Sequence, residues 1–371
     1  MTEPETLQQL DRTYVRYRGR KLSYFAGCDY FRLASHPHVI AALKTGVDRY
    51  GLNVAASRLT SGNHQLYDQL EQALAAFFHA DTAILVPTGS ASNLVTAQAL
   101  AGNFSHALID EQSHPSLVDA ARFLECPILR FKHRDPDEAA AAVRRCGPGA
   151  KLILLTDGMF SRDGTAAPLK EYQALLPKDA WIMVDDAHGA GVLGQSGRGT
   201  LEHSGTSRTR IIQGITLSKA FGTFGGAILG SRALRRRVFE RSGLFIGSTP
   251  LPLPIANAAL ESIRILKNDK RLRARLRSNS DHVKSALQGA GFSFADKPGP
   301  IVTLTSLPAR EFPALKRALL GANIYPSFIR YPGGPPTGYF RFMISSEHSR
   351  QQLDRLIDVL VSRRGRNRPT A

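Results

Sequence analysis

The sequence predicts an α/β protein with a mostly parallel, doubly wound sheet in a large domain and a smaller C-terminal α+β domain. Short apolar segments that read as strands alternate with helical patterns through residue 230. This alternation is typical of parallel sheets with helices on both faces. Several apolar segments end in polar residues, and doubly wound sheets bind ligands at the carboxyl ends of their strands.

The composition is that of an ordinary globular chain, since 371 residues with 43% hydrophobic content can bury a large core. No apolar run approaches the roughly 20 residues that a membrane span needs. Residues 1–5 lack the basic and apolar regions of a signal peptide, so we expect a cytoplasmic protein with no membrane partner. Cys28, Cys126 and Cys146 suit neither a disulfide framework nor a zinc site, and we expect no metal.

The chain is strongly basic, with a formal net charge of +17 and clusters of Lys and Arg at 235–237, 267–277 and 363–368. Such a field attracts polyanions. We do not expect nucleic acid as a partner, because no recognised binding motif is present and few aromatic residues are interleaved. A coenzyme A phosphate or an acidic acyl carrier protein would be attracted by the same charge. The alternative is a solvated helix surface without a partner.

The expected elements follow the chain in order. Residues 1–20 are polar and predict a short arm, and residues 21–27 a short strand. Helices are expected at 38–50 and at 65–79, where leucines recur at helical spacing. Residues 56–63 are rich in turn formers and predict a loop. Strands are then expected at 83–87, 108–110, 151–155 and 181–185, and in the apolar run that begins at Ile211.

The carboxyl-terminal third predicts the smaller domain. Prolines at 250, 252 and 254 mark a boundary, after which one long helix is expected at 255–287. Strands are expected near 301–305 and 339–344, and a last helix at 350–360. The expected division is 1–45 as an arm and the start of the small domain, 46–250 as the large domain, 251–362 as the small domain and 363–371 as a disordered basic tail.

The chemistry is expected at the ends of two apolar runs. The run 211–216 is followed by a polar turn with Lys219, and the run 181–185 ends in Asp185, with His188 three residues later. A lysine amine can hold an aldehyde as a Schiff base, and a carboxylate can keep a pyridine nitrogen protonated. The pair predicts pyridoxal 5'-phosphate as cofactor. The alternative is that Lys219 is a solvent-exposed lysine with no chemical role, because most lysines are exposed.

From about Leu22 to about Leu360 the chain resembles the α-oxoamine synthases, pyridoxal-phosphate enzymes of aminotransferase fold type I. Residues 28–34 stand where relatives have Asn-Asp-Tyr-Leu-Gly-Leu-Ala, and residues 57–62 match Ser-Arg-Leu-x-Ser-Gly. Residues 156–164 match Thr-Glu-Gly-Val-Phe-Ser-Met-Asp-Gly, with Asp157 in place of Glu. Several motifs in the family's order are more specific than any one alone.

The resemblance implies a role for each matched residue. Lys219 would hold the cofactor and carry a proton at the substrate α-carbon, while Asp185 would pair with the pyridine nitrogen. His188 would bond the phenolic oxygen, and His114 would stack on the ring. Arg341 would pair with the amino acid carboxylate, a bidentate contact that lysine reproduces poorly. The other implied contacts are Gly89, Ser90, Thr216, Ser248 and Thr249 to the phosphate and Ser161 near the phenolic oxygen.

The implied activity is the condensation of an amino acid with an acyl thioester and loss of carbon dioxide. L-Alanine and a pimeloyl thioester, on coenzyme A or an acyl carrier protein, are the expected substrates. Ser248 and Thr249 match contacts that a neighbouring subunit contributes, which implies a homodimer with shared sites.

Three positions depart from the family pattern. Cys28 replaces an Asn that lies near the substrate, Tyr67 stands where His is usual, and Ser90 where an aromatic residue is common. Cys28 and Tyr67 are expected to contact the substrate, as Arg341 is. These departures leave open an aminotransferase, a retro-aldol lyase, or a related synthase with another amino acid or acyl chain. A non-catalytic basic binding protein is a further alternative, against which the intact catalytic set, including Lys219 and Arg341, argues.

Overall fold

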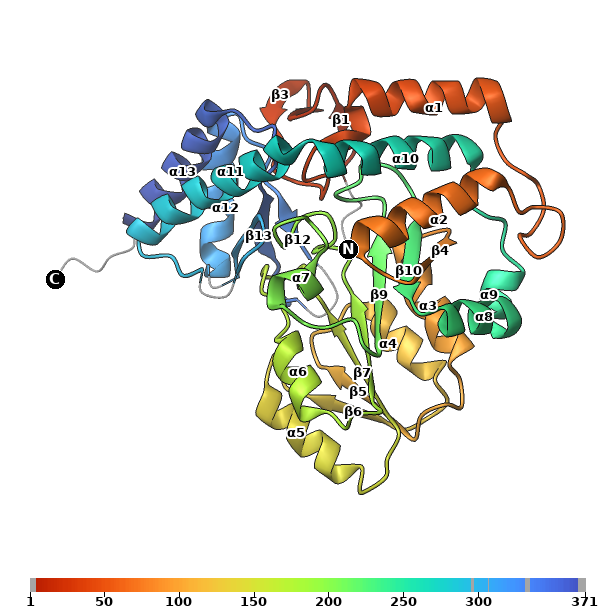
Figure 1. Cartoon of the computed structure of the whole chain (residues 1–371). Helices are drawn as coiled ribbons and strands as arrows, with labels where there is room; N and C mark the ends of the chain where they lie inside the picture. The colour runs from red at the N-terminus through yellow and green to blue at the C-terminus, as the bar shows by residue number, and fades with distance from the viewer. Residues whose placement is uncertain (1–4, 295–296, 306, 331–333, 366–371) are drawn as a thin grey trace. The chain divides into compact units, whose positions relative to one another are not determined.

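The computed structural model describes residues 5–294, 297–305, 307–330 and 334–365 (Figure 1). The chain divides into two compact units. The large unit comprises His36–Phe160 and Ala166–Asp269, and the small unit comprises Met1–Ser35, Ser161–Thr165 and Lys270–Ala371. No helix within the described ranges is long and apolar enough to cross a membrane.

The large unit is built on a seven-stranded sheet with the order β4-β10-β9-β8-β7-β5-β6. Its strands are β4 (Thr82–Val86), β5 (His106–Asp110), β6 (Ile128–Phe131), β7 (Leu152–Asp157), β8 (Trp181–Asp185), β9 (Ile211–Thr216) and β10 (Gly226–Gly230). Only β10 runs antiparallel to its neighbours, β4 and β9. The mostly parallel α/β sheet is therefore confirmed, while β6 and β10 are additional to the expected strands.

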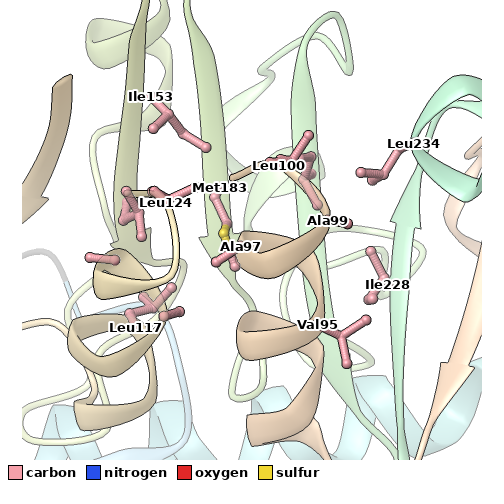
Figure 2. Close-up of a cluster of buried hydrophobic side chains, with 14 of the residues drawn as sticks. Val95, Ala97, Ala99, Leu100, Leu117, Leu124, Ile153, Met183, Ile228 and Leu234 are labelled. Carbon is pink, nitrogen blue, oxygen red and sulfur yellow. The ribbon is translucent and has the colours of Figure 1, made fainter. Parts of the chain in front are cut away.

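Helices cover both faces of this sheet because successive residues of a strand point to opposite sides. Ile153 and Leu155 belong to the core on one face, whereas Leu152 and Leu154 belong to the core on the other. The first core is shown in Figure 2, where Met183 of β8 lies between helices. It is covered by α3 (Gly89–Ala99), α4 (Pro115–Arg122), α8 (Arg232–Arg241) and α9 (Gly243–Ile246), and the second core by α5 (Pro136–Arg145), α6 (Leu169–Leu175) and α7 (Thr200–Ser204).

Three longer helices complete the large unit: α1 (Pro37–Tyr50), α2 (Gln65–Phe78) and α10 (Leu253–Asn268). α10 packs against both α1 and α2 (Figure 1). At the crossing with α1, a side chain at Gly46 would come within 2.8 Å of the Cα of Pro254. This packing places α1 and α10 with the sheet, so the units divide at residues 36 and 270 rather than at the expected 46 and 251.

The single long helix expected at 255–287 is wrong. α10 ends at Asn268, and α11 (Lys270–Gly289) begins after Asp269, whose backbone leaves the helical region at φ −92° and ψ 86°. Asn and Asp side chains bond to nearby backbone groups in non-helical conformations, and this favours a break. The apolar periodicity of the sequence continues across the break, so this periodicity does not indicate that one helix ends and another begins.

The small unit has two antiparallel sheets. The first contains β1 (Gln8–Gln9), β2 (Tyr14–Tyr17) and β3 (Arg20–Ser23), and the second has the order β11-β13-β12, with β11 (Ile301–Leu304), β12 (Phe328–Ile329) and β13 (Tyr339–Met343). The expected arm at 1–20 thus carries strands, and the strand expected at 21–27 ends at Ser23. The remaining elements are α11, α12 (Phe312–Gly321), α13 (Arg350–Gly365) and short 3-10 helices at Leu33–Ser35 and Ala309–Glu311.

The basic tail expected at 363–371 begins inside α13, which extends beyond the expected end at residue 360. Residues 366–371 lie outside the described residues, and so do residues 1–4 of the expected arm.

A buried histidine links two segments of the small unit. The ring of His348 stacks on Phe25, with 4.1 Å between ring centroids. Its Nδ1 accepts from the backbone N–H of Ser345 at 3.0 Å, so its Nε2 carries the proton and donates to the carbonyl of Tyr24 at 3.0 Å. Burial, with a smaller effect of the charge on Arg32, lowers the pKa of His348 to about 3.

We predict that His348 makes folding sensitive to acid. Its folded pKa lies below the ordinary 6.5, so its contribution to stability is complete above pH 6.5 and is lost as the pH falls toward 3. This group alone gives a slope of about 1.4 kcal/mol per pH unit. In urea unfolding between pH 6.5 and 4.5, His348→Gln should show a shallower loss of stability than the unaltered protein. The exposed His38→Gln should keep the original slope, and equal slopes in both variants would contradict the assignment.

Candidate active site

Three parallel strands of the large unit carry polar residues at neighbouring ends. Asp157 of β7 is the register partner of Asp185 of β8, and Asp185 is in turn the partner of Gly214 of β9. The N–H of Gly158 donates to the carbonyl of Asp185 at 2.7 Å. Two residues beyond Gly214, β9 ends at Thr216, and half-buried Lys219 follows in the next turn. The topology therefore assembles one polar edge from segments far apart in sequence.

Asp185 is held by a helix that the sequence analysis does not connect to it. Its Oδ2 accepts from Nδ2 of Asn93 in α3 at 2.6 Å, and its Oδ1 accepts from the N–H of Ala187 at 3.1 Å. Asp185 is only 7% exposed. Hydrogen bonds to both oxygens therefore fix the orientation of the Asp185 carboxyl group within the core.

A chain of hydrogen bonds extends from Asn93 to His114. Nδ2 of Asn93 also donates to Oγ of Ser116 at 2.9 Å, and that hydroxyl lies 2.7 Å from Nδ1 of His114. The N–H of Ser116 donates to the same Nδ1 at 3.2 Å. Because Nδ1 accepts, the proton of the neutral ring lies on Nε2.

His114 is kept uncharged. Burial lowers its pKa, the negative charge of Asp185 opposes this, and the positive charge of Lys219 lowers the pKa further. These interactions show that the structure brings His114, Asp185 and Lys219 together. The backbone N–H of His114 donates to Oδ2 of Asp157 at 2.7 Å. Burial and the charge of Asp185 raise the pKa of Asp157 well above its usual value.

The amino end of α3 approaches β9 closely. A Cβ at Gly89 would lie 2.7 Å from the Cβ of Thr216, so only glycine permits this approach. Oγ1 of Thr88 caps the helix by accepting from the N–H of Ala91 at 3.1 Å. The first-turn N–H groups, including that of exposed Ser90, have no partner within the helix and lie at its positive end. Together with the Thr216 hydroxyl, this arrangement suits a phosphate.

Asp186 has a structural role. Its carboxylate accepts from N and Oγ1 of Thr200 at 2.9 and 2.7 Å and from Nε2 of Gln213 at 2.6 Å. Burial raises its pKa to about 6, although these hydrogen bonds oppose the shift. A Cβ at Gly189 would lie 2.1 Å from Oδ1 of Asp186. The turn after β8, which carries the 7% exposed His188, is therefore fixed around this carboxylate.

The small unit brings together a second group of site residues. Nη1 of Arg341 in β13 donates to the carbonyl oxygen of Ser161 at 2.9 Å, across 180 residues of sequence. Cys28 hydrogen-bonds to Tyr30, which is fully buried. Burial and Cys28 raise the pKa of Tyr30 well above its usual value, and Arg341 opposes the shift. Arg341, Cys28 and Tyr30 thus lie together, and Tyr30 is an addition to the predicted residues.

Tyr67, an expected substrate contact, lies in α2 of the large unit. Its ring is fully buried, and its hydroxyl donates to the carbonyl of Leu251 at 2.6 Å. This bond anchors the segment that leads from Ser248 and Thr249 into α10. Ser248 donates to the carbonyl of Leu244, and Thr249 is exposed. The geometry favours a positioning role for Tyr67.

The donor set of the large unit fits pyridoxal 5'-phosphate. It offers a helix end and a hydroxyl for a phosphate, a buried carboxylate for a protonated ring nitrogen, a neutral imidazole for an aromatic face and a lysine amine for an aldehyde. Asn93 and Ser116 are the members that sequence reasoning missed. One sequence feature could have indicated a role for Asn93, namely an amide side chain at a core-facing position four residues after Gly89.

The comparisons with known proteins agree with this chemistry. The profile of the family described as aminotransferase class I and II matches residues 27–360. The 8-amino-7-oxononanoate synthase of Thioalkalivibrio sulfidiphilus is 37% identical over 346 residues, which are 92% of this chain and 88% of the relative. The enzyme of the same name from Methylococcus capsulatus is 37% identical over 341 residues, which are 91% of this chain and 88% of the relative.

Solved structures give the same result. Serine palmitoyltransferase of Sphingomonas wittichii superposes with a TM-score of 0.89 at 29% identity, over 97% of this chain and 91% of that one. A serine palmitoyltransferase with a pyridoxal-phosphate internal aldimine has a TM-score of 0.89 at 28% identity, over 97% and 92% of the two chains. An 8-amino-7-oxononanoate synthase from Francisella tularensis has a TM-score of 0.77 at 26% identity, over 91% and 96%.

We predict that Gly89→Ala destabilises the protein by about 1–3 kcal/mol, because the added methyl group meets Thr216 and the helix must shift. Urea unfolding without added cofactor measures this effect apart from ligand binding. Gly289→Ala is the matched control, since a Cβ there meets nothing within 4 Å, and it should be neutral or stabilise by up to about 1 kcal/mol. Equal stability of Gly89→Ala and the unaltered protein would show that the approach is not tight.

Proposed function

Because this chain belongs to the aminotransferase class I and II family, we propose that it is a pyridoxal-phosphate-dependent acyltransferase of the α-oxoamine synthase type. It condenses L-alanine with a pimeloyl thioester to give 8-amino-7-oxononanoate, carbon dioxide and the free thiol, a step of biotin biosynthesis. Two relatives at 37% identity are named 8-amino-7-oxononanoate synthase. The observation that carries the proposal is the buried Asp185, fixed by Asn93, beside Lys219 and the neutral His114.

When bound, pyridoxal phosphate supplies an electron sink for negative charge at the substrate α-carbon. Lys219 would hold its aldehyde, and Asp185 would pair with its ring nitrogen. The uncharged ring of His114 would cover its face, and His188 would bond its phenolic oxygen. Gly89, Ser90 and Thr216 would bind its phosphate. We assign the contact near the phenolic oxygen to Ser161.

The residues of the chain perform the remaining work. Arg341 binds the amino acid carboxylate through its planar fork and so orients the α-carbon. The amine of Lys219 takes the α-proton and returns one after carbon dioxide has left. The net reaction forms one carbon–carbon bond, breaks the thioester bond and breaks the bond to the departing carboxylate.

The thioester carrier and the assembly are further parts of the proposal. The net charge of +17 suits either a coenzyme A phosphate or an acidic acyl carrier protein. We propose that the protein is a homodimer in which Ser248 and Thr249 contact the phosphate bound by the other subunit. A cytoplasmic location is consistent with this chemistry.

A second candidate is the same condensation with another amino acid or acyl chain. Cys28 favours it, because a thiol bonded to Tyr30 replaces the amide that relatives place near the substrate. The higher TM-scores with serine palmitoyltransferases also favour it. An aminotransferase or retro-aldol lyase reaction is the remaining alternative on this fold.

The activity can be tested with carboxyl-labelled alanine and pimeloyl-coenzyme A or pimeloyl acyl carrier protein. We expect carbon dioxide and free thiol in equal amounts, and neither product from Lys219→Ala. Release only with serine or with another acyl chain would support the second candidate. Formation of pyruvate without carbon dioxide would identify an aminotransferase and refute the proposal.

We also predict that Asn93→Ala weakens binding of pyridoxal phosphate by about ten- to a hundredfold. The lost hydrogen bond to a charged group is worth about 1.5–3 kcal/mol, and about 1.4 kcal/mol corresponds to a factor of ten. Cofactor titration followed by visible absorbance measures the affinity. The exposed Asn268→Ala should bind the cofactor normally. Unchanged affinity in Asn93→Ala would mean that Asp185 does not depend on this amide.

A further inference from the structure

A cavity of the large unit lies at the edge of the sheet opposite the candidate active site. Its volume is about 330 Å³, and its lining includes Lys151, Trp181 and Arg210. These residues stand at the amino ends of β7, β8 and β9, whose carboxyl ends carry Asp157, Asp185 and Thr216. The cavity therefore shares three strands with the active site but none of its residues.

One side of this cavity is apolar. Trp181 and Phe104 are half-buried at its wall, and Leu100 and Leu234 form part of its floor. Figure 2 shows the two leucines in the core between α3, which ends at Ala99, and α8. Aromatic walls of this kind pack against rings and other flat apolar groups.

The other side is positively charged. Lys151, Arg210 and Arg237 line the cavity with one acidic residue, Asp179. None of these three cations is in an ion pair with an acidic side chain of the described residues. Nη1 of Arg237 instead donates to Oδ1 of Asn103 at 2.6 Å. The guanidinium is thus held in place by an uncharged partner.

Arg210 is held in an unusual backbone conformation. Its φ of +57° is left-handed, which costs a residue with a side chain about 1–2 kcal/mol. Its Nη1 donates to the carbonyl of Asp179 at 3.2 Å, and its own carbonyl accepts from the N–H of Ile182 at 3.0 Å. Strain of this kind is concentrated at ligand sites.

We propose that this cavity binds a small molecule with an oxyanion, a carboxylate or a phosphate, on an apolar ring. The volume is at the lower end of the range of about 300–1,000 Å³ for small-molecule sites. Arginines bind planar oxyanions through paired N–H groups, and Trp181 and Phe104 receive the ring. The proposal does not depend on the function proposed above, because the active-site residues lie at the other ends of the strands.

The experiment uses Trp181 as a reporter, because it is the only tryptophan of the chain. The protein saturated with pyridoxal phosphate is titrated with phenyl phosphate, benzoate and the neutral benzyl alcohol, and tryptophan fluorescence is recorded. Free N-acetyltryptophanamide corrects for collisional quenching. We expect a saturable change with at least one of the two anions and none with the alcohol. The anion that saturates identifies the preferred head group.

Two variants test the charged side of the cavity. Arg237→Gln and Arg210→Asn should each weaken binding of the saturating anion at least tenfold, and Asn is chosen because it tolerates the left-handed backbone. The exposed Arg236→Gln, next to Arg237 on α8, should bind as the unaltered protein does. Melting temperature and visible cofactor absorbance identify any variant that is misfolded. Absence of saturation with both anions, equal binding of benzyl alcohol, or unchanged affinity in both variants would overturn the proposal.

Discussion

The buried carboxylate of Asp186 is the constraint on which the rest of the site depends. A charge removed from water needs hydrogen-bond donors, and three come from Thr200 and Gln213. Their convergence fixes the turn after β8 in one conformation, and glycine at 189 leaves the oxygen atoms room. On one side of Asp186 the turn directs Asp185 toward Asn93, and on the other it carries His188. Asp186 therefore has a structural role, and it determines the positions of Asp185 and His188.

The same edge of the sheet holds two acids on adjacent strands without strong repulsion. Burial and the charge of Asp185 raise the pKa of Asp157, which favours its neutral form, while both oxygens of Asp185 accept hydrogen bonds. The ring of His114, bonded to Asp157 through its backbone, is uncharged for a related reason, because both burial and Lys219 disfavour a second positive charge. The oriented carboxyl group of Asp185 is therefore the acid at this edge that suits a ring nitrogen.

Sequence patterns predicted the features that arise from local chemistry. The apolar runs ending at Asp185 and Thr216 form central strands, and their polar ends meet because parallel strands end at one edge. Features that depend on distant partners were not predicted. The role of Asn93 depends on a carboxylate 92 residues away, and the position of Tyr67 on a carbonyl 184 residues away. The break at Asp269 was missed because the apolar pattern continues through it. The unit boundaries depend on how α10 packs on α1, which prolines in the sequence do not report.

The small unit is assembled from segments at opposite ends of the sequence. Ser23 exchanges backbone hydrogen bonds with Asn323 and Tyr325, and the carbonyl of Phe25 accepts from the N–H of Met343. During synthesis, residues 5–35 leave the ribosome some 300 residues before these partners exist. The large unit is complete at Asp269, and it can form while this first segment still lacks its core. The apolar residues around Phe25 therefore stay without their packing partners until residues 323–343 have been synthesised.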